Sequence, residues 1–252
     1  MSWSSTHLEG GLKFNNGKKP VDLIKRILNL QNDEEYTVLD FFSGSATTAH
    51  AVMKNNLIED TNINFILVQL PYAIPKKDKK LYSGLNNICE IGKERIRRAG
   101  DKILEESENK DLDIGFKVFK VDDSNFIPWN PNVDNVEQAI LSTRDNLVAG
   151  RSELDLIYEL LLKLNLDLNA SIEEVTLDNS LKNKVYVIRN GFMLVCLDEE
   201  LSDSIADDLL NLKKELKSTY TQVVLKDSAL NDSDSINIYE LLKSNNVRFY
   251  TI

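Results

Sequence analysis

The stretch that decides the fold is Thr37-Val-Leu-Asp-Phe-Phe-Ser-Gly-Ser-Ala-Thr-Thr-Ala-His-Ala-Val52. It joins a short apolar run to a turn of small residues and then to a helical pattern. The apolar run, residues 37–42, predicts a strand buried on both faces, with Asp40 near its end. Thr47 and Thr48 suit the N-cap or first turn of a helix predicted over residues 46–55. The stretch therefore predicts a strand–turn–helix unit.

The turn between this strand and helix has the features of a ligand site. Its small residues, 43–46, would let a ligand approach the backbone closely. A carboxylate such as Asp40 is costly at the end of a buried strand unless it meets a cation or several donors. A ligand with an ammonium group and a carboxylate fits, since the ammonium would meet Asp40 and the carboxylate the helix N-terminus. An ordinary corner with a solvated Asp40 is the alternative.

Two phosphate-binding motifs fit the turn poorly. A Walker loop needs a second glycine followed by lysine, and a dinucleotide fingerprint needs three glycines. The turn contains Gly44 alone. Neither motif is therefore expected here.

With its surroundings, the stretch resembles the S-adenosyl-L-methionine (AdoMet)-binding motif of DNA amino-methyltransferases, Asp-x-Phe-x-Gly-x-Gly-Thr-Thr. Lys19-Pro20 lies upstream in a segment similar to the one that precedes this motif in the β-class order. Further segments resemble the adenine-modifying subunit of type III restriction-modification systems: residues 65–71, 94–100, 115–119, 124–129, 224–228 and 247–252. The chain is identified as similar to the C-terminal part of that modification subunit, an adenine-N6 DNA methyltransferase.

The resemblance implies AdoMet as cofactor. The implied cofactor-binding residues are Lys19, Pro20, Asp40, Phe41, Phe42, Ser43, Gly44, Ser45, Ala46, Thr47 and Gln69. Gln69, at the end of the second strand, would meet the ribose hydroxyls as a neutral donor and acceptor. Ala46 stands where the family usually has glycine. If this position needs a positive φ, alanine costs roughly 1 kcal/mol or more there.

Two parts of the family pattern are missing from the sequence. The first is the Asp-Pro-Pro-Tyr-type tetrapeptide that holds the target adenine; the one Pro-Tyr pair, Pro71-Tyr72, lacks the Asp. The second is the long target-recognition region that precedes the Lys-Pro segment. We therefore expect no catalytic residues, no activity of the chain alone, and a separate N-terminal methyltransferase half as partner.

The resemblance implies further partners. They are a restriction subunit, another copy of the subunit in a homo-oligomer, and DNA through the full assembly alone. A non-catalytic assembly fragment of the modification subunit is the alternative function.

Composition limits the class of protein. With 252 residues, 42% of them hydrophobic, the chain can bury a core and form one or two domains. No apolar run has the length of a membrane span and no signal peptide is visible. Cys89 and Cys196 are far apart, which favours reduced thiols, a cytoplasmic location and no metal site. His50 is interpreted as structural or surface.

Charge is unevenly distributed. Residues 1–120 carry 18 Lys/Arg and 17 Asp/Glu, a net charge of +1, whereas residues 121–252 carry 12 and 23, a net charge of −11. The second half is therefore a poor partner for phosphate backbones. Basic clusters at 76–80 and 93–98 are interpreted as a solvated loop and a charged helix face, with weak phosphate contact as the alternative.

The predicted fold is α/β: a partial AdoMet-dependent methyltransferase (Rossmann-like) sheet followed by a small α/β C-terminal domain. The first domain, residues 1–127, would be the cofactor-binding half. Besides the decisive stretch it has predicted helices at 20–30, where Pro20 suits the first turn, and at 84–107, and predicted strands at 64–70 and 116–121. The second, residues 128–252, is a candidate for subunit assembly. After a turn-rich linker at 128–132, in which Trp129 is interpreted as a packing anchor, it has predicted helices at 133–149, 154–166, 202–216 and 235–243. Strands 185–188 and 192–197 form a predicted hairpin, because the pair Asn190-Gly191 between them is a strong turn signal. Further strands are predicted at 221–225 and 247–251, and a loop at 227–235.

Overall fold

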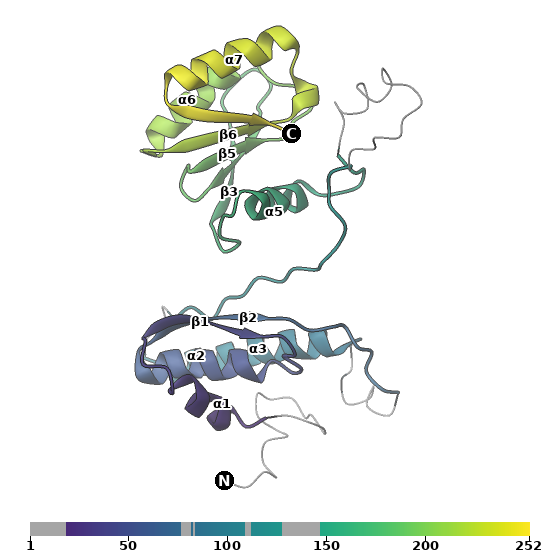
Figure 1. Cartoon of the computed structure of the whole chain (residues 1–252), viewed down its shortest axis with the longest axis vertical. Helices are drawn as coiled ribbons and strands as arrows, with labels where there is room; N and C mark the ends of the chain where they lie inside the picture. Colours follow the sequence, from purple (N-terminus) through teal and green to yellow (C-terminus); the bar gives the residue numbers. More distant parts are fainter. Residues whose placement is uncertain (1–18, 77–81, 83, 109–111, 128–146) are drawn as a thin grey trace. The chain divides into compact units, whose positions relative to one another are not determined.

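The structure is a computed structural model that describes residues 19–76, 82, 84–108, 112–127 and 147–252 (Figure 1). The chain divides into two compact units, Met1–Val118 and Phe119–Ile252. This division falls somewhat before the boundary predicted at 127/128. Both units combine helices with a sheet, so the predicted α/β class is confirmed. None of the described helices is long and apolar enough to cross a membrane.

The first unit packs helices against one face of a two-stranded parallel sheet (Figure 1). Strand β1 (Glu35–Asp40) pairs with β2 (Asn62–Leu67). The helices are α1 (Val21–Leu28), α2 (Thr47–Glu59) and α3 (Ile88–Glu106). The predicted helices and the first two predicted strands are confirmed here, with ends shifted by a few residues.

The prediction that the first strand is buried on both faces is wrong. Tyr36 and Val38 pack toward the helices, whereas Leu39 is 51% exposed and its partner Ile66 is 54% exposed. In the described part of the unit, helices cover just one face of the sheet. The apolar side chains of the other face therefore remain exposed.

The third strand predicted at residues 116–121 is also not found. These described residues belong to no strand or helix. Leu112, Ile114 and Phe116 pack against the core between α2 and α3. Within residues 116–121, Phe116 alone belongs to this core, whereas Val118 and Val121 are 52% and 106% exposed. The alternating pattern therefore does not mark a strand here.

The second unit is a five-stranded sheet with the order β3-β4-β5-β6-β7. The three strands β3, β4 and β5 are antiparallel, and the pairs β5-β6 and β6-β7 are parallel. Helices α6 and α7 cover one face and α5 covers the other (Figure 1). The strands are β3 (Ile172–Thr176), β4 (Lys184–Ile188), β5 (Met193–Cys196), β6 (Thr221–Leu225) and β7 (Val247–Thr251), and the helices are α5 (Glu153–Lys163), α6 (Ile205–Glu215) and α7 (Asp232–Ser244).

Most predictions for this unit are confirmed, including the hairpin of β4 and β5 across Asn190-Gly191. Strand β3 was not predicted. The predicted loop at 227–235 is wrong in part, because a short 3₁₀ turn occupies Asp227–Ala229 and α7 begins at Asp232, capped by the Asn231 side chain. The predicted linker, Trp129 and most of the helix predicted at 133–149 lie outside the described residues.

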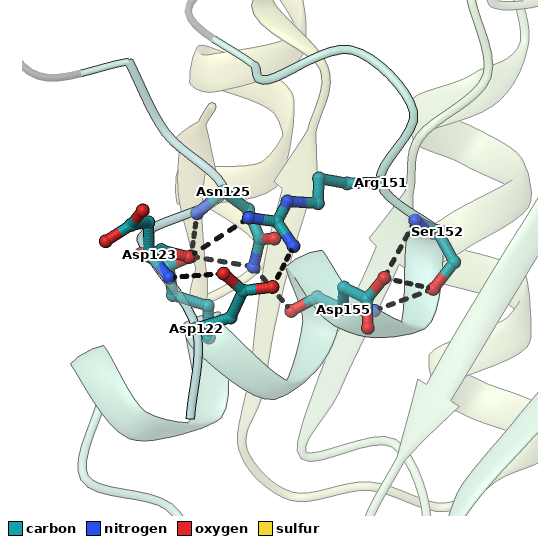
Figure 2. A network of polar contacts seen from close by, with 7 residues as sticks. Asp122, Asp123, Asn125, Arg151, Ser152 and Asp155 are labelled. Atoms are coloured by element: carbon teal, nitrogen blue, oxygen red, sulfur yellow. Dashed lines mark hydrogen bonds and ion pairs between the residues drawn. The ribbon is translucent and has the colours of Figure 1, made fainter. Parts of the chain in front are cut away.

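Polar contacts fasten residues 122–125 to α5 and to the residues before it (Figure 2). Glu159 accepts hydrogen bonds from Ser124 Oγ at 2.6 Å and from the Asn125 backbone N–H at 2.7 Å. The Nδ2 group of Asn125 donates to Glu159 as well, at 2.8 Å. Arg151 Nη1 lies 2.7 Å from Asp122 Oδ2. Figure 2 also shows Ser152 and Asp155, which close a capping box at the start of α5.

The hairpin turn gives the first testable prediction. At Gly191 (φ +90°) an added Cβ would lie 3.0 Å from Leu216 Cδ1, whereas at Gly150 (φ +82°) it would meet nothing within 4 Å. We expect Gly150→Ala to lower the free energy of unfolding by about 1 kcal/mol through backbone strain. In Gly191→Ala the new Cβ would also crowd Leu216. We therefore expect this variant to lose about 2–4 kcal/mol of unfolding free energy in total. Urea denaturation measures both, and equal losses would contradict the crowding argument.

The contacts of Glu159 predict a pH dependence. Burial raises the pKa of Glu159, but the hydrogen bonds from Ser124 and Asn125 and the Lys163 ammonium outweigh it, so its pKa lies below the usual 4.5. A lowered pKa stabilises the fold above the unfolded-state pKa, and that stabilisation is lost as the pH falls through the folded-state pKa. We expect Glu159→Gln to be less stable than the wild type at neutral pH and nearly equal to it at about pH 3.

Thermal unfolding across this pH range measures the effect. Glu173→Gln, a change at an exposed position on β3, serves as the control. A stability gap that is the same at acid and neutral pH would rule out the ionised Glu159 as its source.

A candidate ligand site at the turn between β1 and α2

The carboxyl ends of β1 and β2 lie together because the strands are parallel. The Val68 N–H donates to the Asp40 carbonyl at 2.8 Å, and the Ser43 N–H donates to the Val68 carbonyl at 3.3 Å. The turn after β1 and the segment after β2 therefore run side by side. This is the edge of an α/β sheet where ligands usually bind.

The Asp40 carboxylate closes the turn. Its Oδ2 accepts a hydrogen bond of 2.6 Å from Thr48 Oγ1, and its Oδ1 accepts one of 3.2 Å from the Phe42 N–H. The half-buried carboxylate thus meets donors, as its position requires. Each carboxylate oxygen has a second lone pair, so Asp40 can still accept from an ammonium group.

The Gln69 side chain contacts the turn from the segment that follows β2. Its Oε1 accepts from the Gly44 N–H at 2.7 Å, and its Nε2 donates to the Leu70 carbonyl at 3.0 Å. Cys89, at the start of α3, donates from Sγ to the Gln69 carbonyl at 3.3 Å. The amide that we expected to meet ribose hydroxyls therefore holds the turn in this structure.

The backbone at Ala46 is left-handed, with φ 58° and ψ 42°. Ala46 therefore occupies a conformation that favours glycine. The positive φ that makes alanine costly at this position is thus present in the structure. Ala46 is also the N-cap of α2, and its methyl side chain makes no capping hydrogen bond. Thr47 and Thr48 are consequently first-turn residues. Among the described residues, the first N–H groups of α2 therefore lack the N-cap side-chain acceptor that usually satisfies them, which is the arrangement of an anion site.

Not all small residues of the turn face outward as expected. Ser45, Ala46 and Thr47 are buried and contact α3, whereas Ser43 and Gly44 are half-buried. Helix α3 comes close because Gly92 has no side chain: a Cβ there would lie 3.5 Å from Ala46 Cβ and 3.6 Å from the Gly44 carbonyl. The small residues thus admit a helix on one side of the turn.

Arg95 is a residue of this site that sequence reasoning missed. It is fully buried, and its Nη1 donates to Thr47 Oγ1 at 2.6 Å and to Ser45 Oγ at 3.0 Å. The basic cluster at 93–98 was interpreted as a charged helix face, which is wrong for Arg95. The available signal was helical phase, because Arg95 lies four residues from both Ile91 and Ala99, which are buried.

The remaining predicted site residues lie at the margin or elsewhere. Phe41 and Phe42 follow β1 and are 59% and 86% exposed. Pro20 precedes α1, and its carbonyl accepts from the N–H groups of Leu23 and Ile24, while Lys19 is exposed. No hydrogen bond or ion pair among the described residues joins Lys19 or Pro20 to the turn. The described residues also contain no cluster of His, Cys, Asp and Glu that could hold a metal.

Backbone strain at Ala46 can be measured directly. Ala46→Gly removes the cost of the left-handed backbone, about 1–2 kcal/mol, and loses one buried methyl group worth about 0.8 kcal/mol. Ala49→Gly, also fully buried but inside α2, loses a methyl group and about 1 kcal/mol of helix propensity. We expect urea denaturation to show Ala46→Gly at least as stable as the wild type and Ala49→Gly about 2 kcal/mol less stable. Equal destabilisation would argue against strain at Ala46.

Comparison with known proteins gives consistent matches. A family model described as DNA methylase matches residues 2–67. The Mod subunit of the type III restriction-modification enzyme StyLTI from Salmonella typhimurium is 40% identical over 102 residues, which is 40% of this chain and 16% of that subunit. The EcoPI Mod subunit from Escherichia phage P1 is 40% identical over 120 residues, 46% of this chain and 18% of that subunit.

A third relative is the type II methyltransferase M.KpnI from Klebsiella pneumoniae, 31% identical over 91 residues, which is 36% of this chain and 22% of that protein. The chain therefore matches less than a quarter of the length of each of these relatives. The matches confirm the resemblance predicted from the motifs: the chain is similar to a part of the DNA-methylating Mod subunits of type III restriction-modification enzymes.

Proposed function

We propose that this chain is the AdoMet-binding part of a site-specific adenine-N6 DNA methyltransferase, the modification subunit of a type III restriction-modification system. The observation that carries the proposal is the turn after β1, where a carboxylate lies beside a helix start whose N-cap residue, Ala46, makes no side-chain cap bond. Similarity to Mod subunits supports the assignment.

The donor set fits the amino-acid end of AdoMet. The Asp40 carboxylate would accept from the ammonium group, and the N–H groups at the start of α2 would receive the carboxylate. Gln69 lies beside the turn and would have to exchange its bond to Gly44 for one to a ribose hydroxyl. AdoMet, when bound, supplies a methyl group on an electrophilic sulfonium. The protein's contribution here would be to bind and orient it.

Transfer to DNA requires parts that this sequence lacks. The acceptor would be an adenine amino group in a base flipped out of the duplex. The sequence contains no Asp-Pro-Pro-Tyr-type tetrapeptide to hold that base. We therefore propose that a complementary methyltransferase half, in another chain or another part of the same protein, completes the active site.

The open face of the first sheet supports a complementary half. Its described apolar residues are strongly exposed, and they continue beyond the strand ends into the segments next to the turn: Leu39, Phe41, Phe42, Ile66, Val68 and Leu70. An apolar patch of this kind usually marks an interaction surface. A half that covered it would also lie beside the proposed cofactor site.

Assembly is the second candidate function. Residues 121–252 carry a net charge of −11, which disfavours contact with phosphate backbones and leaves protein partners as the better match. The partners would be a restriction subunit or another copy of this chain. If the chain has this role alone, it associates without binding AdoMet, and light scattering with AdoMet titration separates the two functions.

Isothermal titration of AdoMet into the full chain tests the first proposal. We expect binding in the micromolar range, weakened about tenfold or more by Asp40→Asn, which keeps the shape of the side chain and removes its charge. Asp60→Asn is the matched control, because Asp60 is exposed at the opposite end of α2. A folded wild-type chain that binds no AdoMet, or an Asp40→Asn variant that binds it equally well, would contradict the proposal.

A further inference from the structure

The guanidinium of Arg95 is buried in the first unit beneath the candidate site. Its relative exposure is 0%, although arginine is almost never fully buried unless it is paired or hydrogen-bonded. Arginines nearby on α3 behave differently: Arg98 forms an exposed pair with Glu94 at 2.7 Å, and Arg97 lies over the Phe116 ring. The burial of Arg95 is therefore specific to its position on the helix.

Three of the bonds that Arg95 makes go to the turn and to the start of α2. Its Nη1 donates to Thr47 Oγ1 at 2.6 Å, to Ser45 Oγ at 3.0 Å and to the Ser45 carbonyl at 3.4 Å. The first two acceptors are side chains on either side of Ala46. Arg95 thus holds the two residues that flank the left-handed position.

A second contact with α3 lies one helical turn before Arg95. Gly92 faces Ala46 and the Gly44 carbonyl at the closest approach of the helix to the turn. On the other side of the turn, Thr48 is bonded to Asp40. A strained backbone persists only where surrounding contacts hold it in place. Here the contacts with α3 and the bond between Thr48 and Asp40 hold the backbone around Ala46.

We propose that Arg95 is a positioning residue for the amino-acid end of AdoMet. It would set the geometry of the turn and of the first N–H groups of α2, and its charge would add to the positive end of the helix dipole. This inference rests on the proposed function. It predicts that losing Arg95 weakens recognition of the ligand's amino-acid end and leaves recognition of the adenosine end intact.

The test compares two ligands on the full chain. AdoMet carries both ends, whereas 5′-methylthioadenosine lacks the ammonium and the carboxylate. We expect Arg95→Met to weaken AdoMet about tenfold or more and to leave binding of 5′-methylthioadenosine nearly unchanged. Arg95→Lys keeps the charge and should recover part of the AdoMet affinity. Arg98→Met, on the exposed face of the same helix, should change neither affinity.

Equal loss of both ligands in Arg95→Met would overturn the proposal, because a residue with a merely structural role would act on both. Unchanged AdoMet binding in Arg95→Met would also overturn the proposal. If Arg95→Met does not fold, Thr47→Val and Thr47→Ser repeat the comparison from the acceptor side. Thr47→Val should lose AdoMet selectively, and Thr47→Ser should retain it.

Amide hydrogen exchange distinguishes failure of this inference from failure of the proposed function. If the folded wild-type chain binds no AdoMet, the proposed function fails, and exchange of the amides of residues 43–48 still tests the positioning role. Arg95→Met should accelerate exchange in these residues about tenfold or more relative to α1. Unchanged exchange would overturn the positioning role.

Discussion

The hydrogen bond of 2.6 Å from the Thr48 hydroxyl to the Asp40 carboxylate ties the end of β1 to the first turn of α2. The site depends on this link, because it brings a negative group next to a helix start whose N-cap residue makes no side-chain cap bond. It also holds the chain in a turn whose Ala46 has a left-handed backbone. The cost of that conformation is offset by burial of Ala46 and by the contacts of the turn with α3.

The two faces of the first sheet differ in a way that bears on function. One face is covered by α1, α2 and α3, and its inward side chains form the core of the unit. The other presents exposed Leu39 and Ile66 within the described residues. The second unit has helices on both faces of its sheet, and its core is formed by its own residues. The sheet face that the described helices leave uncovered therefore belongs to the first unit, beside the proposed cofactor site.

Local patterns predicted most elements, because each carries its own signal. Pro20 marked the start of α1, and Asn190-Gly191 marked the hairpin turn. Three features were not predicted, and for Arg95 alone the local sequence carried a signal, its helical phase. The open face of β1 depends on which helices cover the sheet. Residues 116–121 alternate as a strand does, yet they have no strand partner among the described residues, and Val118 and Val121 are exposed. Arg95 looked like part of a charged face because the turn that buries it lies far away in sequence.

The central claim is that the turn between β1 and α2 binds the amino-acid end of AdoMet. Amide NMR spectra of the full chain during an AdoMet titration test it most directly, since they report which residues the ligand reaches. The account predicts that the largest shifts fall on the backbone amides of residues 43–48 and on the side-chain amide of Gln69. Saturating AdoMet that leaves these signals unchanged, or that shifts signals elsewhere instead, would contradict it.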